Sequence, residues 1–466
     1  MEVILRLTET QHAQLRAHLF PGDGKEAVAI ALCGRRAGET RHCLMVQKIV
    51  PVASDHCRVR TPMRVTWGTD LLLTPLAEAV QQGLALVKIH SHPGGFAGFS
   101  ACDDASDRAL FPSIYGWMEN DQPHASAIML PDGRLIGRTV SPEGAFDPLG
   151  MVAVVGDDLH FWYARDHTLE VPEFARRHAQ VFGAGTTARL RRLAVAVIGC
   201  SGTGSPVIEQ LARLGVGKLV LVDPDRVEEK NLNRILHATM DDARHYRLKV
   251  DVIAQAIAKM GLGTDVIALG RHLGEPAVVR AVAACDVLFG CMDSVDGRHL
   301  LNRLATFYLQ PYFDVGIKIE ADGVGGVEQV CGTVHYLQPG KSSLLSRGTY
   351  TMEQVRAAGL RRANPAAYAA ELHAKYLVGV QEDRPAVMSV NMQFASLAVN
   401  EFLARLHPYR DDDNTHFATY RLSLTQAQLY TEGEGEPCRV LARHVGRGDT
   451  RLLLDMPELS EREPQV

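Results

Sequence analysis

A sequence of buried strand, glycine-rich turn and helix in the middle of the chain constrains the fold more than any other feature. Residues 193–198 (LAVAVI) form a continuous apolar run of strand length, residues 199–204 (GCSGTG) follow directly, and a helical pattern occupies residues 205–214. Further strand-sized runs alternate with helical stretches, which is typical of a doubly wound parallel sheet. The sequence therefore predicts an α/β, Rossmann-like domain. Its later strands are expected at residues 218–222, 265–269, 286–290 and 311–316.

The chain has 466 residues, too many for one ordinary hydrophobic core, so we expect two or three domains. After residue 316 the alternation gives way to a different pattern. There we expect longer strands within 323–337, a polar segment at 340–383, one helix at 388–406 and a hairpin of 417–424 with 428–431. The expected domains are residues 1–165, a linker and lead-in helix at 166–192, the Rossmann-like domain at 193–435, and a loose tail at 436–466.

The N-terminal third mixes strand and helix patterns. Apolar runs predict strands at residues 27–33 and 84–90. Residues 125–130 and 134–140 flank Pro131-Asp132-Gly133, a turn sequence that predicts a β-hairpin. A short helix is expected at residues 103–110, because acidic residues open it.

Composition excludes several classes of function. The net charge of −5 is spread without long blocks, so we expect no nucleic-acid partner. No apolar run reaches the roughly 18 residues of a membrane helix, and the N-terminus lacks a signal-peptide core, so we expect no membrane association and a cytoplasmic location. The nine cysteines are scattered and never spaced as C-x-x-C, which argues against disulfides and a cysteine-built zinc site.

A group of metal-ligating residues lies in the first domain. His90 and His92 are two apart at a strand end, so their side chains point the same way, and Asp103 follows eleven residues later. Two imidazoles and one carboxylate are the ligand count of a catalytic zinc site with a position left for water. Ser100 suits an oxyanion-stabilising hydrogen bond, and Glu26, before an apolar strand, is the best upstream general base.

The same residues have a structural interpretation, a strand-end histidine pair with an unrelated helix-capping aspartate. A deaminase-type zinc site is disfavoured, because no P-C-x-x-C accompanies the histidines. The full pattern of Glu, H-x-H-P, Ser and Asp resembles the JAB1/MPN/Mov34 metalloprotease family. The resemblance implies a curved central sheet and cleavage of a peptide or isopeptide bond at the C-terminus of a ubiquitin-like protein. It implies His90, His92 and Asp103 as zinc ligands, Glu26 as acid and base, and Ser100 as oxyanion stabiliser.

The glycine-rich turn of the second domain predicts a phosphate-binding loop, because it follows a buried strand and opens a helix. Its glycines are Gly199, Gly202 and Gly204. Asp223 ends the next strand, where an acid can bind ribose hydroxyls, a pattern that would also suit an NAD enzyme. NAD binding does not need the set of polar side chains that follows. Stabilising the charge on an α-phosphate during substitution does require such side chains. This set comprises Asp225, Asn231, Arg234 and Lys249, with Asp293 further along at a strand end, where Mg²⁺ could bind.

These motifs resemble the ThiF/MoeB/ubiquitin-activating-enzyme superfamily over residues 175–430. The resemblance implies that ATP adenylates the C-terminal glycine of a ubiquitin-like protein. Asp223 would bind ribose, Asn231, Arg234 and Lys249 the triphosphate, and Asp293 the Mg²⁺, followed by Arg298 as in the motif. It also implies a homodimer through this domain, in which the partner subunit contributes an arginine. Arg176 or Arg177 in the lead-in helix is the matching candidate.

One departure from this superfamily concerns cysteine. Relatives carry C-x-x-C zinc pairs and often a thioester-forming cysteine in the crossover segment, but residues 340–385 contain no cysteine. Either the acyl-adenylate passes to another protein's nucleophile or a distant cysteine moves in. Cys438 is the candidate in the tail, and a structural role for it is the stronger interpretation.

Taken together, the sequence predicts a bifunctional enzyme of a ubiquitin-like pathway. One domain would adenylate a modifier with ATP and Mg²⁺, and the other would cleave at its C-terminus with Zn²⁺. The setting could be protein conjugation with an E2-like partner, by analogy in antiviral defence. The alternative is activation of a sulfur-carrier protein whose tail the first domain trims. A third possibility is a scaffold with one or both sites inactive, which the intact metal set argues against.

Overall fold

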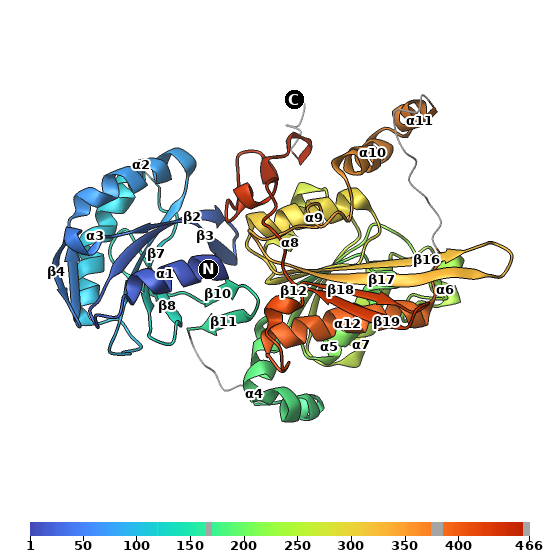
Figure 1. The fold of residues 1–466 in the computed structure, drawn as a ribbon, viewed down its shortest axis with the longest axis horizontal. Coiled ribbons are helices and arrows are strands. Elements are labelled where there is room, and N and C mark those ends of the chain that lie inside the picture. Colours follow the sequence, from blue (N-terminus) through green and yellow to red (C-terminus); the bar gives the residue numbers. More distant parts are fainter. Residues whose placement is uncertain (119, 165–169, 374–384, 460–466) are drawn as a thin grey trace. The chain divides into compact units, whose positions relative to one another are not determined.

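The computed structural model describes residues 1–118, 120–164, 170–373 and 385–459 (Figure 1). The chain divides into two compact units. The N-terminal unit comprises Met1–His167 with two short segments, Phe307–Leu309 and Val445–Asp455, and the C-terminal unit comprises the rest. None of the helices in the described ranges has the length and hydrophobicity of a membrane-spanning segment.

A nine-stranded mixed sheet forms the core of the N-terminal unit. Its strand order is β11-β10-β1-β3-β2-β6-β7-β8-β9. The strands are β1 (Glu2–Thr8), β2 (Val28–Arg36), β3 (Arg41–Pro51), β6 (Ala85–Ser91), β7 (His124–Met129), β8 (Leu135–Val140), β9 (Phe146–Pro148), β10 (Met151–Val155) and β11 (Leu159–Tyr163). A separate two-stranded hairpin, β4 (Cys57–Thr61) with β5 (Arg64–Trp67), follows β3. The predicted hairpin is confirmed as β7 and β8, with Gly133 at φ +87° in its turn.

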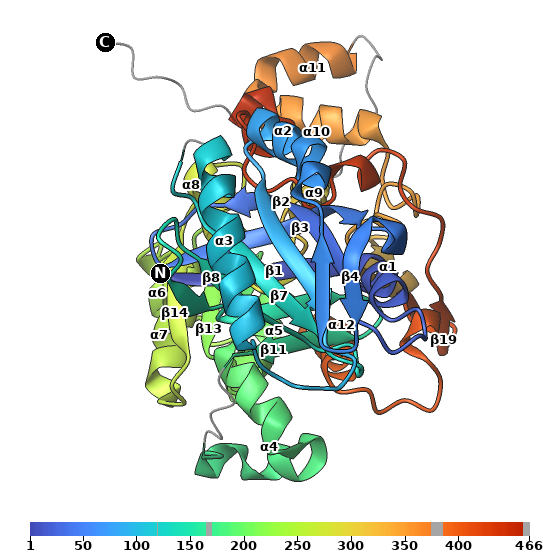
Figure 2. The ribbon, with the colours of Figure 1, turned by 90° about the vertical axis from the view of Figure 1, so that its left-hand side faces the viewer.

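Helices cover both faces of this sheet because its strands are apolar on both sides. The helix α1 (Glu9–Leu19) packs on one face. On the other lie α2 (Leu73–Gln82) and α3 (Ala101–Met118), the near face in Figure 2. The helix α3 is longer than the predicted 103–110, since it continues through Pro112 and buries an apolar side. Its buried apolar residues are Leu110, Phe111, Ile114, Tyr115 and Met118.

The C-terminal unit contains the predicted parallel sheet, extended by antiparallel strands. Its order is β14-β13-β12-β15-β16-β17-β18-β19, and the strands from β14 to β16 pair in parallel. The strands are β12 (Ala194–Ile198), β13 (Lys218–Val222), β14 (Asp265–Leu269), β15 (Val287–Gly290), β16 (Tyr312–Ala321), β17 (Val327–Leu337), β18 (Thr419–Ser423) and β19 (Gln428–Glu432). The chain order of strands and helices confirms the doubly wound prediction.

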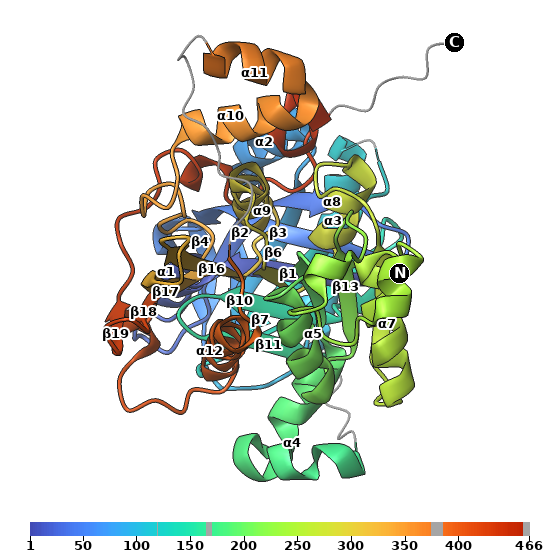
Figure 3. The same ribbon diagram turned by 90° about the vertical axis from the view of Figure 1, so that its right-hand side faces the viewer.

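Helices lie on both faces of this sheet (Figures 1 and 3). The helices α5 (Gly204–Arg213), α7 (Lys249–Met260) and α12 (Met388–Leu406) occupy one face, and α8 (Pro276–Ala283) and α9 (Val295–Phe307) the other. The remaining helices are α4 (Arg176–Arg192), α6 (Met240–Arg244), α10 (Met352–Ala363) and α11 (Pro365–His373). The predicted helix at 388–406 coincides with α12.

Two segments differ from the sequence-based expectation. The polar segment at 340–383 contains α10 and α11, because a capping box at Thr351 and Gln354 begins a helix there. Residues 374–384 of that segment lie outside the described part of the chain.

Part of the expected loose tail is ordered: residues 445–455 lie against β2 of the N-terminal unit. A Cβ on Gly34 would be 2.1 Å from the Gly446 carbonyl oxygen, so the two backbones touch there.

Candidate active sites

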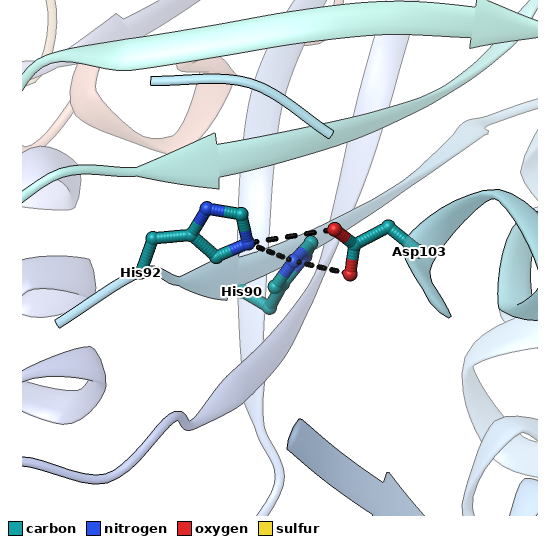
Figure 4. Close-up of side chains that lie close together, drawn as sticks. All are labelled: His90, His92 and Asp103. Carbon is teal, nitrogen blue, oxygen red and sulfur yellow. Dashed lines mark hydrogen bonds and ion pairs between the residues drawn. The ribbon is translucent and has the colours of Figure 1, made fainter. Parts of the chain in front are cut away.

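The strand β6 and the helix α3 bring the predicted metal ligands together. Alternate residues of β6 face α3, which places His90 toward that helix, and His92 follows the end of the strand. Asp103 lies in the first turn of α3. The Nε2 atoms of the two histidines are 3.1 Å apart, and they lie 3.0 and 3.5 Å from the Asp103 carboxylate oxygens (Figure 4). Three donor atoms thus converge on one point, all within 4.8 Å of one another.

The hydrogen bonds around these side chains fit a zinc ion. His92 Nδ1 lies 2.9 Å from the Phe96 carbonyl oxygen, which can only accept, so Nδ1 carries the proton and Nε2 presents its lone pair. Within the described residues, the buried Nδ1 of His90 has no hydrogen-bond partner. Two imidazole nitrogens and one carboxylate oxygen are a donor set that Zn²⁺ takes in catalytic sites.

Ser100 forms hydrogen bonds with the proposed ligand Asp103. Its amide and its hydroxyl each donate to Asp103 Oδ2 at 2.7 Å, and the Asp103 amide donates back to Ser100 Oγ at 3.2 Å. This reciprocal pair starts α3 as a capping box does. Burial alone would raise the pKa of Asp103, but the neighbouring His90, His92 and Ser100 side chains hold that pKa well below its usual range. The carboxylate is therefore held in the charged form that a metal ligand requires.

Glu26 lies next to this group, just before β2. Burial raises the pKa of its carboxyl group to about 7, with His92 opposing the shift and Asp103 adding to it. The β4–β5 hairpin holds the residue in place, since the Glu26 amide donates to the Thr61 carbonyl at 2.9 Å and Arg60 Nε donates to the Glu26 carbonyl at 2.9 Å. Arg60 and Thr61 were not predicted from the sequence, because no local pattern indicates contacts between segments so far apart.

The glycine-rich turn of the C-terminal unit packs so closely that side chains are excluded. Gly199 has φ +91°, and a Cβ there would be 2.6 Å from the Cys291 carbonyl oxygen. A Cβ on Gly204 would be 1.7 Å from the Gly199 carbonyl oxygen. The turn therefore wraps tightly from β12 into α5, whose N-terminal amides can face an anion.

Asp223, at the end of β13, is bound to this turn. Its carboxylate accepts hydrogen bonds from the amides of Cys200, at 2.7 Å, and Asp225, at 2.9 Å. Burial raises the pKa of Asp223, while Lys249 opposes the shift. Lys249 Nζ lies 2.7 Å from Asp225 Oδ2. Three predicted nucleotide residues therefore meet at the carboxyl edge of the sheet.

Gly202 lies beside another predicted residue, Arg234, and beside Asn391, which sequence analysis missed. A Cβ on Gly202 would be 3.0 Å from Arg234 Cδ and 2.1 Å from Asn391 Nδ2. Asn391 is a buried polar residue of α12, and the sequence pattern does not set it apart from the other polar residues of that helix.

Asn231 and Asp293 were also predicted. The backbone carbonyl of Asn231 accepts a hydrogen bond from the Arg234 amide at 3.1 Å. Asn231 is buried and accepts from the Glu228 amide in a local turn. Asp293 is exposed in the link between β15 and α9.

Models of two protein families match different parts of the chain. A model of the ThiF family matches residues 174–438. The chain belongs to the ThiF family. A model of the prokaryotic homologs of the JAB domain matches residues 8–135, so the predicted fusion of a JAB-like domain with a ThiF domain is confirmed.

The curated relatives match a quarter to a third of this chain. The Mus musculus adenylyltransferase and sulfurtransferase MOCS3 is 38% identical over 115 residues, which are 24% of this chain and 24% of that protein. The Bombyx mori ubiquitin-like modifier-activating enzyme 5 is 26% identical over 166 residues, 33% of this chain and 39% of that protein. The chain thus spans about a quarter to two fifths of these relatives. Among solved structures, E. coli MccB with ATP is 17% identical, with a TM-score of 0.43, and the match covers 57% of this chain and 73% of that chain.

Two further predictions concern other parts of the ThiF domain. Cys438 is 2% exposed and its amide donates to the Lys341 carbonyl at 3.0 Å, a setting that agrees with a structural role. Arg176, the first residue of α4, is exposed and forms an ion pair with Glu173 at 2.8 Å. Gly183, at φ +78°, interrupts the predicted lead-in helix.

Proposed function

We propose that the ThiF domain adenylates the C-terminal carboxylate of a ubiquitin-like or sulfur-carrier protein. The carboxylate oxygen attacks the α-phosphorus of ATP, the bond to the β-phosphate breaks, and pyrophosphate leaves. The observation that carries the proposal is the tight glycine-rich turn that opens α5, with the Arg234 side chain beside Gly202 and Lys249, the first residue of α7, paired with Asp225. The names of the relatives support the same chemistry.

Four of the predicted residues have roles in this reaction. The amides at the start of α5 bind phosphate, and the charges of Arg234 and Lys249 offset the negative charge that develops on it. The exposed carboxylate of Asp293 is free to approach Mg²⁺ on the triphosphate, and Asp223 keeps the turn in shape beside the ribose. Action as a homodimer, with an arginine from the partner subunit, is part of the same proposal.

Pyrophosphate exchange tests this activity. The chain, ATP, Mg²⁺ and a small protein ending in glycine should exchange labelled pyrophosphate into ATP. Arg234→Ala and Asp293→Ala should abolish the exchange. Arg213→Ala, which removes an exposed arginine at the end of α5, should not. Exchange that survives Arg234→Ala would contradict the assignment.

We propose further that the JAB-like domain is a zinc hydrolase that cuts the peptide or isopeptide bond after the same C-terminus. His90, His92 and Asp103 would hold the metal. A bound zinc ion supplies Lewis acidity, which lowers the pKa of water and polarises a carbonyl group. Glu26 takes a proton from the attacking water and passes it to the leaving amine, a task that a pKa of about 7 suits. The Ser100 hydroxyl donates its hydrogen bond to Asp103. It can stabilise the oxyanion only if it rotates away from Asp103 and breaks that bond.

Cleavage of a modifier extended at its C-terminus tests this second activity. Glu26→Gln should lose at least about 100-fold in kcat and keep one bound zinc per chain, because the three ligands stay intact. Glu143→Gln, an exposed glutamate of the same unit, is the matched control. Equal cleavage by Glu26→Gln and the unaltered chain would show that another residue is the base.

The alternative is sulfur-carrier activation with trimming of the carrier. The cysteine-free segment at 340–385 favours it, since a thioester would need Cys438 or another protein. Mass spectrometry of the modifier distinguishes the two. A C-terminal thiocarboxylate indicates sulfur transfer, and an adduct to an E2-like protein indicates conjugation. A chain that binds no zinc and catalyses no exchange would be a scaffold.

A further inference from the structure

A second ionic contact joins the strand and the helix that carry the proposed metal ligands. Lys88 lies two residues before His90 on the same face of β6. Asp107 lies one helical turn after Asp103 in α3. The Lys88 ammonium group forms an ion pair with Asp107 Oδ1. Asp107 is fully buried and Lys88 is 5% exposed, so the pair is enclosed within the domain.

The two contacts between β6 and α3 match in spacing. Two residues of a strand rise about 6.6 Å, and four residues of a helix rise about 6 Å. The contacts His90–Asp103 and Lys88–Asp107 therefore form successive cross-links between two elements that run in opposite directions. Moving α3 by one residue would break both, so Lys88–Asp107 fixes the register that brings Asp103 to the histidines.

Arg138 holds the same helix from a second strand, β8. Its Nη2 and Nε atoms donate to Asp107 Oδ2 at 2.7 and 3.2 Å, and its Nη1 donates to Asp104 Oδ1. The guanidinium lies 3.7 Å from the ring centres of Phe99 and Phe146. Phe99 directly precedes Ser100, so Arg138 also fixes the loop that leads into α3. Contacts to two strands restrict both the position and the rotation of the helix.

Stability alone does not explain this arrangement. Removing paired charges from water costs about as much as their attraction returns, and apolar side chains of similar volume pack as well. Apolar packing, however, tolerates small shifts of a helix along a strand. Ion pairs and the paired hydrogen bonds of a planar guanidinium group restrict such shifts, because they need specific positions of both partners. Lys88 and Arg138 also form ion pairs with the neighbouring acids Asp104 and Asp107. Asp103 therefore remains available to the two histidines.

We propose that Lys88, Asp107 and Arg138 are positioning residues. They set the register of α3 on β6 and so hold Asp103 where a zinc ion binds. The inference rests on the zinc site proposed above.

The test uses the full chain and the double variant Lys88→Met/Asp107→Leu, which removes both charges and leaves Arg138 its partner Asp104. Zinc affinity from competition with a chelator should fall about 10- to 100-fold, the usual effect of losing a group that orients a metal ligand. With Co²⁺ in place of Zn²⁺, the visible absorption of the bound ion should weaken or shift. The thermal midpoint with EDTA and the pyrophosphate exchange should stay near their original values. The control is Lys48→Met/Glu78→Leu, which removes a solvent-accessible ion pair of the same unit and should change none of these.

The outcomes are distinguishable. Zinc affinity and a Co²⁺ spectrum like those of the unaltered chain would overturn the positioning role alone. Absence of zinc binding in the unaltered chain would overturn the zinc site and this inference with it. If the double variant does not fold, Arg138→Lys tests the proposal instead. This variant keeps the positive charge but loses the paired hydrogen bonds of the guanidinium group to Asp104 and Asp107. It should weaken zinc binding about 10-fold, and unchanged binding would overturn the proposal.

Discussion

Asp223 and Cys200 are joined by a 2.7 Å hydrogen bond from the Cys200 amide to the Asp223 carboxylate, although 23 residues separate them. The bond ties the end of β13 to the glycine-rich turn that follows β12. The second carboxylate oxygen accepts from the Asp225 amide, so both oxygens of Asp223 shape the backbone around the proposed nucleotide site. The residue predicted to bind ribose thus also supports the phosphate-binding turn.

Replacing Asp223 by asparagine should weaken ATP binding. One side of the new amide would present N–H groups to a backbone N–H, so one of the two hydrogen bonds must break, at a cost of about 1.5–3 kcal/mol. We expect ATP affinity to fall at least about 10-fold in calorimetric titration. Asp265→Asn, an exposed acid at the start of β14, is the matched control and should bind ATP normally. Unchanged affinity of Asp223→Asn would mean that the turn keeps its shape without the carboxylate.

Gly204→Ala should destabilise the ThiF domain. The added Cβ would lie 1.7 Å from the Gly199 carbonyl oxygen, so α5 or the turn must shift, at a cost of about 1–3 kcal/mol in the free energy of unfolding. Gly359→Ala in α10 is the control. Nothing lies within 4 Å of its added Cβ, and helix propensity should there add about 0.5–1 kcal/mol of stability. Denaturant unfolding measures both, and opposite signs are expected.

Zinc should stabilise the JAB-like domain selectively. A ligand at about 1,000 times its dissociation constant adds about 4 kcal/mol to the free energy of unfolding, so chelation should lower the corresponding thermal transition. His90→Ala should remove the response to zinc. His56→Ala, at an exposed histidine, should keep it. A ThiF-domain transition that moved equally with zinc would contradict a site confined to the JAB-like domain.

Acid should destabilise the JAB-like domain through His124. Burial, together with the charge of Arg35, lowers the pKa of His124 to about 3, whereas an unfolded histidine titrates near 6.5. Between about pH 3 and about pH 6.5, His124 is therefore protonated in the unfolded chain and neutral in the folded chain. His124 therefore contributes full stability above about pH 6.5, and its contribution falls as the pH drops toward 3, by up to about 1.4 kcal/mol per unit.

The measurement for His124 is denaturant unfolding from pH 7.5 to 4.5 with EDTA present. His124→Gln should flatten the loss of stability at low pH, and His160→Gln, at an exposed histidine, should not. A variant as acid-sensitive as the original would place the titrating group elsewhere.

The predictable parts of the fold are those with strong local periodicity. The apolar runs after residue 193 became the parallel strands β12 to β16. The central strands β12, β13 and β15 are apolar because they are buried on both faces. The turn Pro131-Asp132-Gly133 set the β7–β8 hairpin. Periodicity alone did not predict α10, α11 or the extension of α3 through Pro112. The capping box at Thr351 and Gln354 is a local signal for α10 that the prediction did not use.

The candidate site divides in the same way. Residue types and spacing determined His90, His92, Asp103, the glycine-rich turn and the acid that ends β13, since each depends on chemistry carried by a short stretch of chain. Tertiary structure decided what surrounds them, because such contacts join residues far apart in sequence. It gave Glu26 its raised pKa by burial and tied that residue to Arg60 and Thr61 of the β4–β5 hairpin. It also placed Asn391 beside Gly202, and aligned Lys88 with Asp107.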